Sequence, residues 1–145
     1  MDPRVARLQT IADCESFATN AQIRGAPELA EQARKRALYI RADAYGAVTE
    51  VERECLLAVY AYEEILSSKK GRRQPAARTW QMIQRHGIIP AVERVVTKRE
   101  ISMGFTALSE MRLMDFAFEA VVLRHPDYFS ENAISISRNR LLALE

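Results

Sequence analysis

The chain has 145 residues, of which 48% are hydrophobic and 28% are charged. This balance is typical of a folded globular protein and excludes a disordered chain, and the length is that of one domain, here expected to span residues 1–145. The formal net charge is only +2, from 21 Lys and Arg residues against 19 Asp and Glu residues.

No segment carries the pattern of export or membrane insertion. The first ten residues, MDPRVARLQT, lack the apolar core of a secretory signal, and the longest apolar run, Cys55–Tyr62, is too short to cross a bilayer. Cys14 and Cys55 lie in apolar helical segments, so we expect two buried, reduced thiols. The sequence therefore predicts a cytoplasmic protein with no membrane partner.

Helix start and stop signals divide the N-terminal half into predicted helices over residues 3–24, 27–45 and 50–67. Pro3 and Pro27 each stand where a helix begins, because proline lacks the N–H that a first turn leaves unpaired. Thr49 and Glu52 form a capping box, the reciprocal pairing of side chain and backbone that starts a helix.

A basic connector over residues 67–74 precedes the C-terminal half, where we expect helices at 75–86, at 90–98, from about 106, and at 131–144. The segment 114–123 is apolar on most of its circumference, which predicts a buried, central helix. No strand alternation is present. The sequence thus predicts an all-α fold: a compact bundle of about six to seven helices around a buried apolar helix near residues 114–124.

The strongest functional signal is a local excess of positive charge. The stretch from Ile65 to Val92 contains six basic residues and no acidic one, which leaves 15 of the 21 basic residues against all 19 acidic ones elsewhere. Such a segment attracts phosphate groups, because each neutralised phosphate releases a condensed counterion. The other interpretation is a solvated loop whose charges only keep the protein in solution.

The stretch from Arg78 to Lys98 has the spacing of a helix-turn-helix. Two helices flank a turn of about four residues that contains glycine, and the second helix of such a motif can enter a major groove. Its exposed side would then carry, or lie near, four residues: Glu93, Arg94, Thr97 and Lys98. Any two packed helices that are joined by a glycine turn also give this pattern.

Three carboxylates, Glu110, Asp115 and Glu119, cluster in an apolar part of the chain. Asp115 and Glu119 are expected to share a helix face at spacing i, i+4. One interpretation is a general base or a metal-binding pair; the other is a buried salt bridge to an arginine such as Arg112 or Arg124. No zinc, phosphate-loop or nucleophile motif is present, so we assign no catalytic residue, metal or cofactor.

Two main hypotheses follow. The first is a small nucleic-acid-binding protein, regulatory or accessory, with DNA as the expected ligand and the helix-turn-helix-like segment at 78–98. Its contacts would come from eight basic residues: Lys69, Lys70, Arg72, Arg73, Arg78, Arg85, Arg94 and Lys98. The second is a homodimeric helical protein–protein interaction module without enzymatic activity, whose basic loop docks an acidic partner and whose four tyrosines between residues 39 and 62 supply a dimer surface. An enzyme built on the three carboxylates is the weaker alternative.

Overall fold

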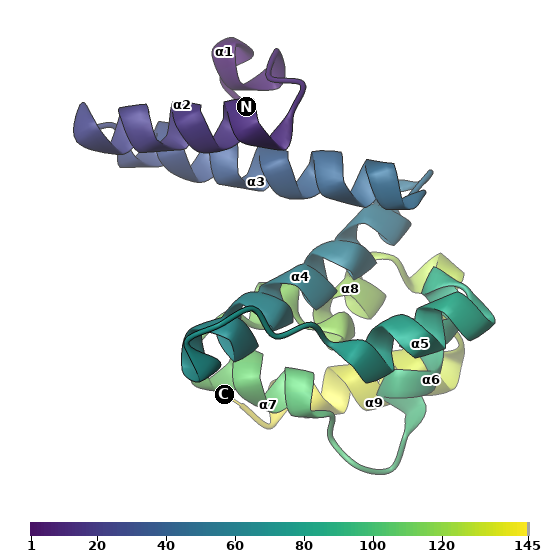
Figure 1. The fold of residues 1–145 in the computed structure, drawn as a ribbon. Coiled ribbons are helices and arrows are strands. Elements are labelled where there is room, and N and C mark those ends of the chain that lie inside the picture. The colour runs from purple at the N-terminus through teal and green to yellow at the C-terminus, as the bar shows by residue number, and fades with distance from the viewer. Residues whose placement is uncertain (145) are drawn as a thin grey trace. The chain divides into compact units, whose positions relative to one another are not determined.

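A computed structural model describes residues 1–144, and Glu145 lies outside the described residues. The described residues form nine α-helices and two short 3-10 helices with no strand, which confirms the all-α prediction (Figure 1). The chain divides into two compact units, Met1–Val48 and Thr49–Glu145. The single domain expected over residues 1–145 stays a prediction, and each unit is described by itself.

The first unit is a helical hairpin with a short leading turn: α1 (Pro3–Ala6), α2 (Ile11–Ile23) and α3 (Pro27–Tyr45). Helices α2 and α3 run side by side (Figure 1). Small side chains line their contact, because four of the five residues at its buried centre are alanines. Ala residues let helix backbones approach closely, and alanine is also the strongest helix former.

The predicted helix over residues 3–24 is two helices in the structure. The chain leaves helical geometry after α1, and Thr10 caps α2 by accepting a hydrogen bond from the Asp13 N–H at 3.0 Å. Asp2 caps α1 as expected, through the Arg4 N–H. A second N-cap inside an apolar pattern therefore overrides the helical periodicity around it.

The second unit begins with its longest helix, α4 (Glu50–Lys70). Its capping box is confirmed: the Thr49 N–H donates to Glu52 Oε1 at 3.1 Å, and the Glu52 N–H donates to Thr49 Oγ1 at 3.3 Å. Every residue from Cys55 to Tyr60 is buried, so α4 forms much of the core. The helix extends three residues beyond its predicted end and stops at Gly71, whose φ of 68° suits glycine.

The remaining helices pack around α4. They are α5 (Ala77–His86), α6 (Ile88–Thr97), α7 (Met103–Glu110), α8 (Phe118–Arg124) and α9 (Glu131–Leu142), with 3-10 helices η1 (Met114–Phe116) and η2 (Pro126–Tyr128). Only Gly87, with φ of 95°, separates α5 from α6. The expected turn of four residues is therefore shorter than predicted, and Pro90 lies inside the first turn of α6, where its missing N–H costs nothing.

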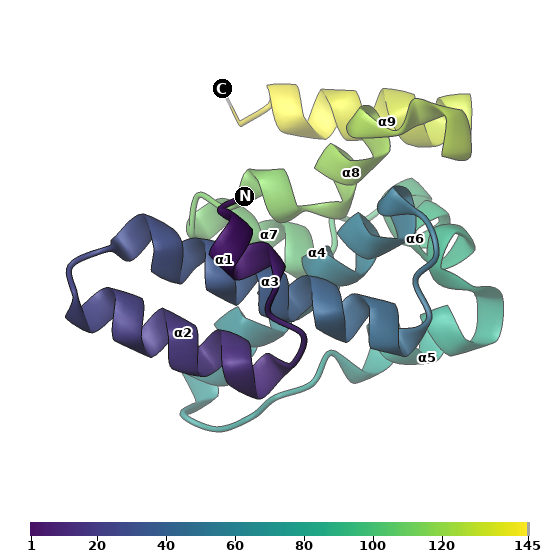
Figure 2. The ribbon, with the colours of Figure 1, turned by 90° about the horizontal axis from the view of Figure 1, so that it is seen from above.

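The buried apolar segment near residues 114–124 is present, but in two pieces. Ala117 is extended, with ψ of 149°, and separates η1 from α8. Helix α8 contacts α4, α6 and α9, and Figure 2 shows it lying between α9 and α4. Val121 and Val122 are fully buried there. The break places Asp115 and Glu119 on separate helical segments, so they do not share a helix face as predicted.

Two further expectations concern the cysteines and the membrane. Cys14 and Cys55 are both buried and free, as predicted. Burial raises the pKa of the Cys55 thiol to about 12. No helix within residues 1–144 combines the length and the apolar character that a bilayer span requires.

Candidate functional site

The basic connector is fixed to α4 at both ends. The Gln74 N–H donates to Ser67 Oγ at 2.9 Å, which closes the loop between α4 and α5. The Glu63 carboxylate accepts the Ala76 N–H at 2.8 Å and the Trp80 indole N–H at 2.7 Å. These bonds pin the start of α5 against α4, and they give Trp80 an anchoring role rather than an exposed stacking face.

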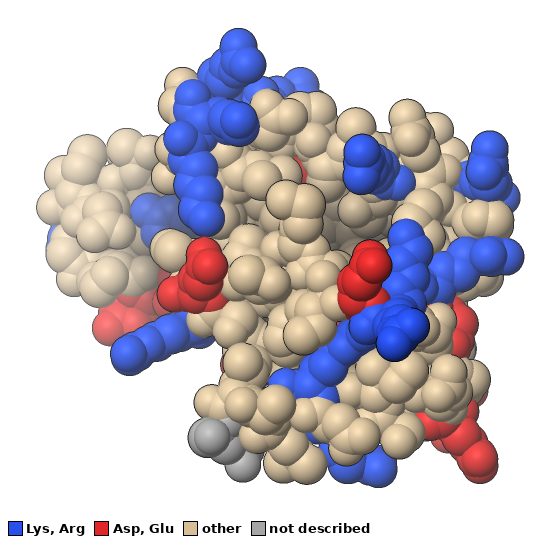
Figure 3. Space-filling model, turned by 90° about the horizontal axis from the view of Figure 1, so that it is seen from below, with Lys and Arg blue, Asp and Glu red and all other residues tan. Residues whose placement is uncertain are grey.

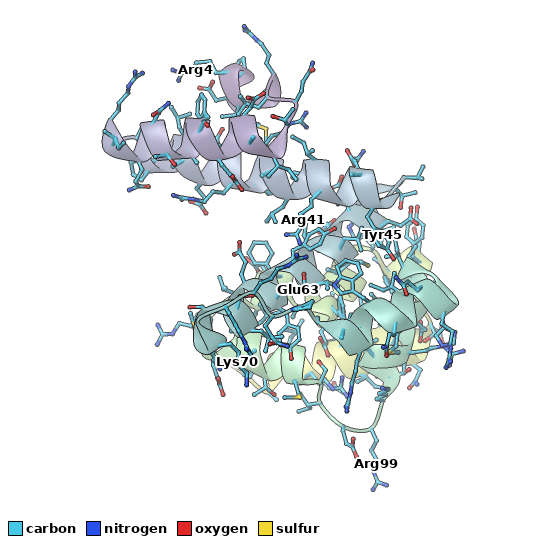
Figure 4. The ribbon with its side chains drawn as sticks, in the orientation of Figure 1. Arg4, Arg41, Tyr45, Glu63, Lys70 and Arg99 are labelled. Carbon is cyan, nitrogen blue, oxygen red and sulfur yellow. The ribbon has the colours of Figure 1, made fainter. Side chains whose placement is uncertain are left out.

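Between these anchors, four cations are exposed to solvent: Lys69, Lys70, Arg72 and Arg73. Figure 4 shows Lys70 at the end of α4. Lys69 Nζ lies 3.6 Å from Glu110 Oε2, with both side chains more than half exposed. Such a surface pair contributes roughly 0–1 kcal/mol, so a phosphate can displace Glu110 readily. The other three form no ion pair with any residue of the described chain.

A second group of cations lies at a cavity of about 550 Å3 within the second unit. Its walls come from α4, α5, α7, the start of α8 and the loop after α6, and they are largely apolar. Arg78 and Lys98 both line it, although 20 positions separate them in the sequence. Figure 3 shows this face of the unit as a mostly uncharged, hollowed surface with Lys and Arg side chains and some acidic side chains around it. The acidic residues Glu100 and Glu119 also line the cavity.

Hydrogen bonds fix the loop that follows α6 and lines the cavity. The Arg140 guanidinium of α9 donates to the backbone carbonyl oxygens of Lys98 at 2.7 Å and Val96 at 3.0 Å. Ser102 ends the loop as the N-cap of α7, where its Oγ accepts the Phe105 N–H at 3.0 Å. Both ends of the loop are thereby fixed, while Arg99 projects from it into solvent (Figure 4).

A third group of cations surrounds the turn between α5 and α6. Arg85 and Arg94 are exposed, and both lie close enough to His86 for their charges to lower its pKa. Desolvation lowers the pKa of His86, and the positive charges of Arg94 and Arg85 lower it further. Two predicted contact residues from different helices are therefore neighbours in space.

Helix α6 presents little surface for a groove, because it packs against α4, α5, α8 and α9. Of its ten residues only Pro90 and Arg94 are exposed. Glu93 caps α9, accepting the Ser130 N–H and Oγ–H at 2.8 Å each. Thr97 donates from its hydroxyl to the Glu93 carbonyl at 2.7 Å. The helix-turn-helix role stays a prediction, and two of its four named residues are occupied within the unit.

Glu119 is 1% exposed and forms a buried ion pair, with Arg140 Nη1 at 3.1 Å from its Oε2. The salt-bridge interpretation is confirmed, but the partner is neither Arg112 nor Arg124. Burial raises the pKa of Glu119, and this desolvation outweighs the opposing effects of a backbone hydrogen bond and of Arg140. The carboxylate is consequently a structural group that fixes α8 to α9.

The other two carboxylates lie on the surface. Glu110 pairs with Lys69, and Asp115 is exposed on η1. The three acidic residues therefore do not converge in an open pocket, which removes the basis for an enzyme built on them. Within residues 1–144, no group of three His, Cys, Asp or Glu residues has the arrangement of a metal site.

Two features of the second unit are not evident from the sequence. One is the cavity, whose apolar lining residues recur at helical spacing and so resemble ordinary core residues. The other is a cluster of Glu54 with Arg124 and His125: Arg124 Nε donates to Glu54 Oε1 at 2.5 Å, and His125 Nε2 contacts Oε2. Burial alone would raise the pKa of Glu54, but the hydrogen bonds from His125 and Arg124 lower it below the ordinary value.

No protein-family model matches the chain, and no curated protein or solved structure is similar to it.

Proposed function

We propose that the protein binds nucleic acid through the phosphate backbone, as a small regulatory or accessory protein of the cytoplasm. One observation carries this proposal: all eight basic residues in the predicted contact set are exposed, and only Lys69 forms an ion pair within the described chain. Cations held in internal salt bridges would have to break them before binding. The seven residues other than Lys69 have no such pair to break, so neutralising a phosphate costs little beyond the ordering of their side chains.

The cations form three groups: one on the connector, one at the cavity and one at the turn between α5 and α6. Separate groups of this kind suit an extended polyanion that crosses the surface of the second unit. Their exposure on long, flexible stems favours contacts that position a backbone rather than read base edges. The proposal therefore expects binding with strong salt dependence and with little dependence on sequence.

The test is fluorescence anisotropy of labelled single-stranded DNA, duplex DNA and RNA across a salt series. The variant carries four alanine substitutions in the connector: Lys69→Ala, Lys70→Ala, Arg72→Ala and Arg73→Ala. If all four residues contact phosphates, the slope of log affinity against log salt falls by about 3 for a single strand. Salt-sensitive binding that weakens in this way supports the proposal.

The matched control removes four exposed cations elsewhere and changes the net charge equally: Arg7→Ala, Arg24→Ala, Arg34→Ala and Arg138→Ala. Its slope should stay near that of the unmodified protein. Equal losses in both variants would mean that only total charge matters. Negligible binding of every nucleic acid by the unmodified protein would reject the proposal.

The second candidate, a homodimeric interaction module, is favoured by two exposed apolar side chains. Ile101 is 55% exposed and Met103 is 76% exposed, and both lie at the cavity. The tyrosine surface has less support, because Tyr60 is buried against Trp80 and Tyr62 is half-buried. Sedimentation equilibrium distinguishes the candidates: a dimer that Met103→Glu dissociates would support the module, whereas a monomer at all concentrations would reject it.

A further inference from the structure

We propose that the cavity of the second unit receives an unpaired base, so that the preferred ligand is a single strand rather than a duplex. This inference rests on the proposed function and specifies its substrate class. Two cations of the predicted contact set, Arg78 and Lys98, line the cavity.

The walls of the cavity match the chemistry of a nucleobase. Aromatic side chains from three helices line it, namely Tyr62 of α4, Phe105 of α7 and Phe118 of α8. A base has flat faces that pack on such apolar and aromatic surfaces, whatever its identity. The volume of about 550 Å3 lies within the range of sites that enclose small organic molecules, so a base fits with room to spare.

Polar groups are available for the edge of the base. Gln74, Thr79 and Ser102 also line the cavity. The side-chain amide of Gln74 and the hydroxyl of Thr79 form no hydrogen bond with the described residues, since Gln74 bonds only through its backbone N–H. Ser102 accepts the Phe105 N–H and keeps its own proton to donate. A few polar groups on apolar walls are the usual composition of a small-molecule site.

Arg78 and Lys98, the two cations that line the cavity, would hold the phosphates that flank the inserted base. Arg78 lies in the first turn of α5, shortly after the connector with its exposed cations, and Lys98 directly follows α6. A strand with one base in the cavity would therefore continue toward Lys70, Arg72 and Arg73. One strand would then contact both the cavity and the connector.

A duplex fits this surface less well. Its bases are stacked and paired, and removing one from the stack costs a few kcal/mol. Groove reading by α6 cannot compensate, because only Pro90 and Arg94 of that helix are exposed. A single strand needs no unstacking, so it gains the cavity contacts at little cost.

The test compares three labelled probes of equal length: a single strand of thymidylates, the same strand with abasic positions throughout, and a duplex. The abasic strand keeps every phosphate and removes every base. We expect the base-containing strand to bind at least about tenfold more tightly than the abasic strand, from stacking of one base in the cavity. The same preference is expected over the duplex at equal salt.

Two methionines, one at the start of α7 and one directly after its end, provide a matched pair of variants. Met103 lines the cavity and is 76% exposed, whereas Met111 lies outside it and is 55% exposed. Met103→Glu and Met111→Glu change the net charge equally, and both side chains face solvent, so both variants should fold. Only Met103→Glu should abolish the preference for the base-containing strand. Met82→Trp, which fills the cavity from α5, should do the same without a change of charge.

The outcomes separate the two proposals. Equal affinity for the three probes, or equal effects of Met103→Glu and Met111→Glu, would overturn the cavity assignment and leave backbone binding in place. No salt-sensitive binding of any probe would overturn both. A tenfold preference that Met103→Glu and Met82→Trp remove, and Met111→Glu keeps, would establish the cavity as a base-binding site.

Discussion

The buried pair of Glu119 and Arg140 allows a direct test of what holds the second unit together. Arg140→Met keeps an apolar stem of similar length and removes the guanidinium. Three acceptors then lose their donor: Glu119 Oε2 at 3.1 Å, the Val96 carbonyl at 3.0 Å and the Lys98 carbonyl at 2.7 Å. Water can replace the donor at Lys98, which is exposed, far more readily than at Glu119, which is 1% exposed.

The magnitude follows from the charge that is left behind. Removing one partner of a buried ion pair costs about 3–5 kcal/mol, since the other remains buried and uncompensated. We expect Arg140→Met to lower the free energy of unfolding by about this amount. Adding Glu119→Leu should recover most of the loss, because replacing both partners with apolar residues is often neutral or stabilising. The loss should also shrink at acid pH, where Glu119, whose pKa is already raised by burial, becomes neutral.

Urea unfolding followed by Trp80 fluorescence measures these changes, because Trp80 is the only tryptophan and belongs to the second unit. With a urea slope of about 1–3 kcal/mol/M, the midpoint of Arg140→Met should fall by about 2 M. Arg138→Met is the control: Arg138 is exposed on the same helix, and the change should stay within about 0.5 kcal/mol. A loss below about 1 kcal/mol, or a double variant no more stable than Arg140→Met, would refute the reasoning.

The remaining predictions concern a titrating carboxylate and a thiol. Because the pKa of Glu54 is lowered, its bonds to His125 and Arg124 add stability at pH values above the ordinary pKa of 4.5, and this stability is lost as the pH falls through the folded-state pKa. Glu54→Gln should therefore lower the free energy of unfolding by about 1–2 kcal/mol at pH 6, and by progressively less toward pH 3, in urea titrations. A difference that grows on acidification would contradict this sign. Cys55, with a pKa of about 12, should not react with a thiol-specific reagent at pH 8 until the protein unfolds, and rapid labelling of the native protein would show that the core of α4 opens.

Most helix starts could be predicted because capping is local. The capping box of Thr49 and Glu52 begins α4 as predicted, and the helix expected from residue 131 begins there with Ser130 as its N-cap, since an N-cap depends only on residues within one turn. The break before Thr10 was missed because the apolar spacing continues across it. The break at Ala117 could not be predicted, since it depends on how η1 and α8 pack against α4 rather than on a local breaker.

Some features of the candidate site could likewise be predicted from the sequence, and others could not. The exposure of the basic residues follows from charge alone, because an unpaired Lys or Arg is almost never buried. The partner of Glu119 does not follow, since Arg140 lies 21 positions away and its approach depends on the packing of α8 and α9. The cavity is hidden for a related reason: Tyr62, Phe105 and Phe118 have the spacing of core residues, and only their arrangement in space leaves a hollow between them.

Affinity and selectivity would come from different parts of this surface. The connector cations are exposed, and all of them except Lys69 are unpaired within the described chain, so they would supply attraction that depends on salt and not on bases. The cavity would supply the preference for unpaired bases. One of its walls is the loop after α6, which Arg140 fixes by hydrogen bonds to the Lys98 and Val96 carbonyls. Any change that loosens this loop without unfolding the unit should therefore reduce the preference for the base-containing strand before it reduces affinity for the abasic one. The arginine that compensates the buried charge of Glu119 would then also keep the proposed base site open.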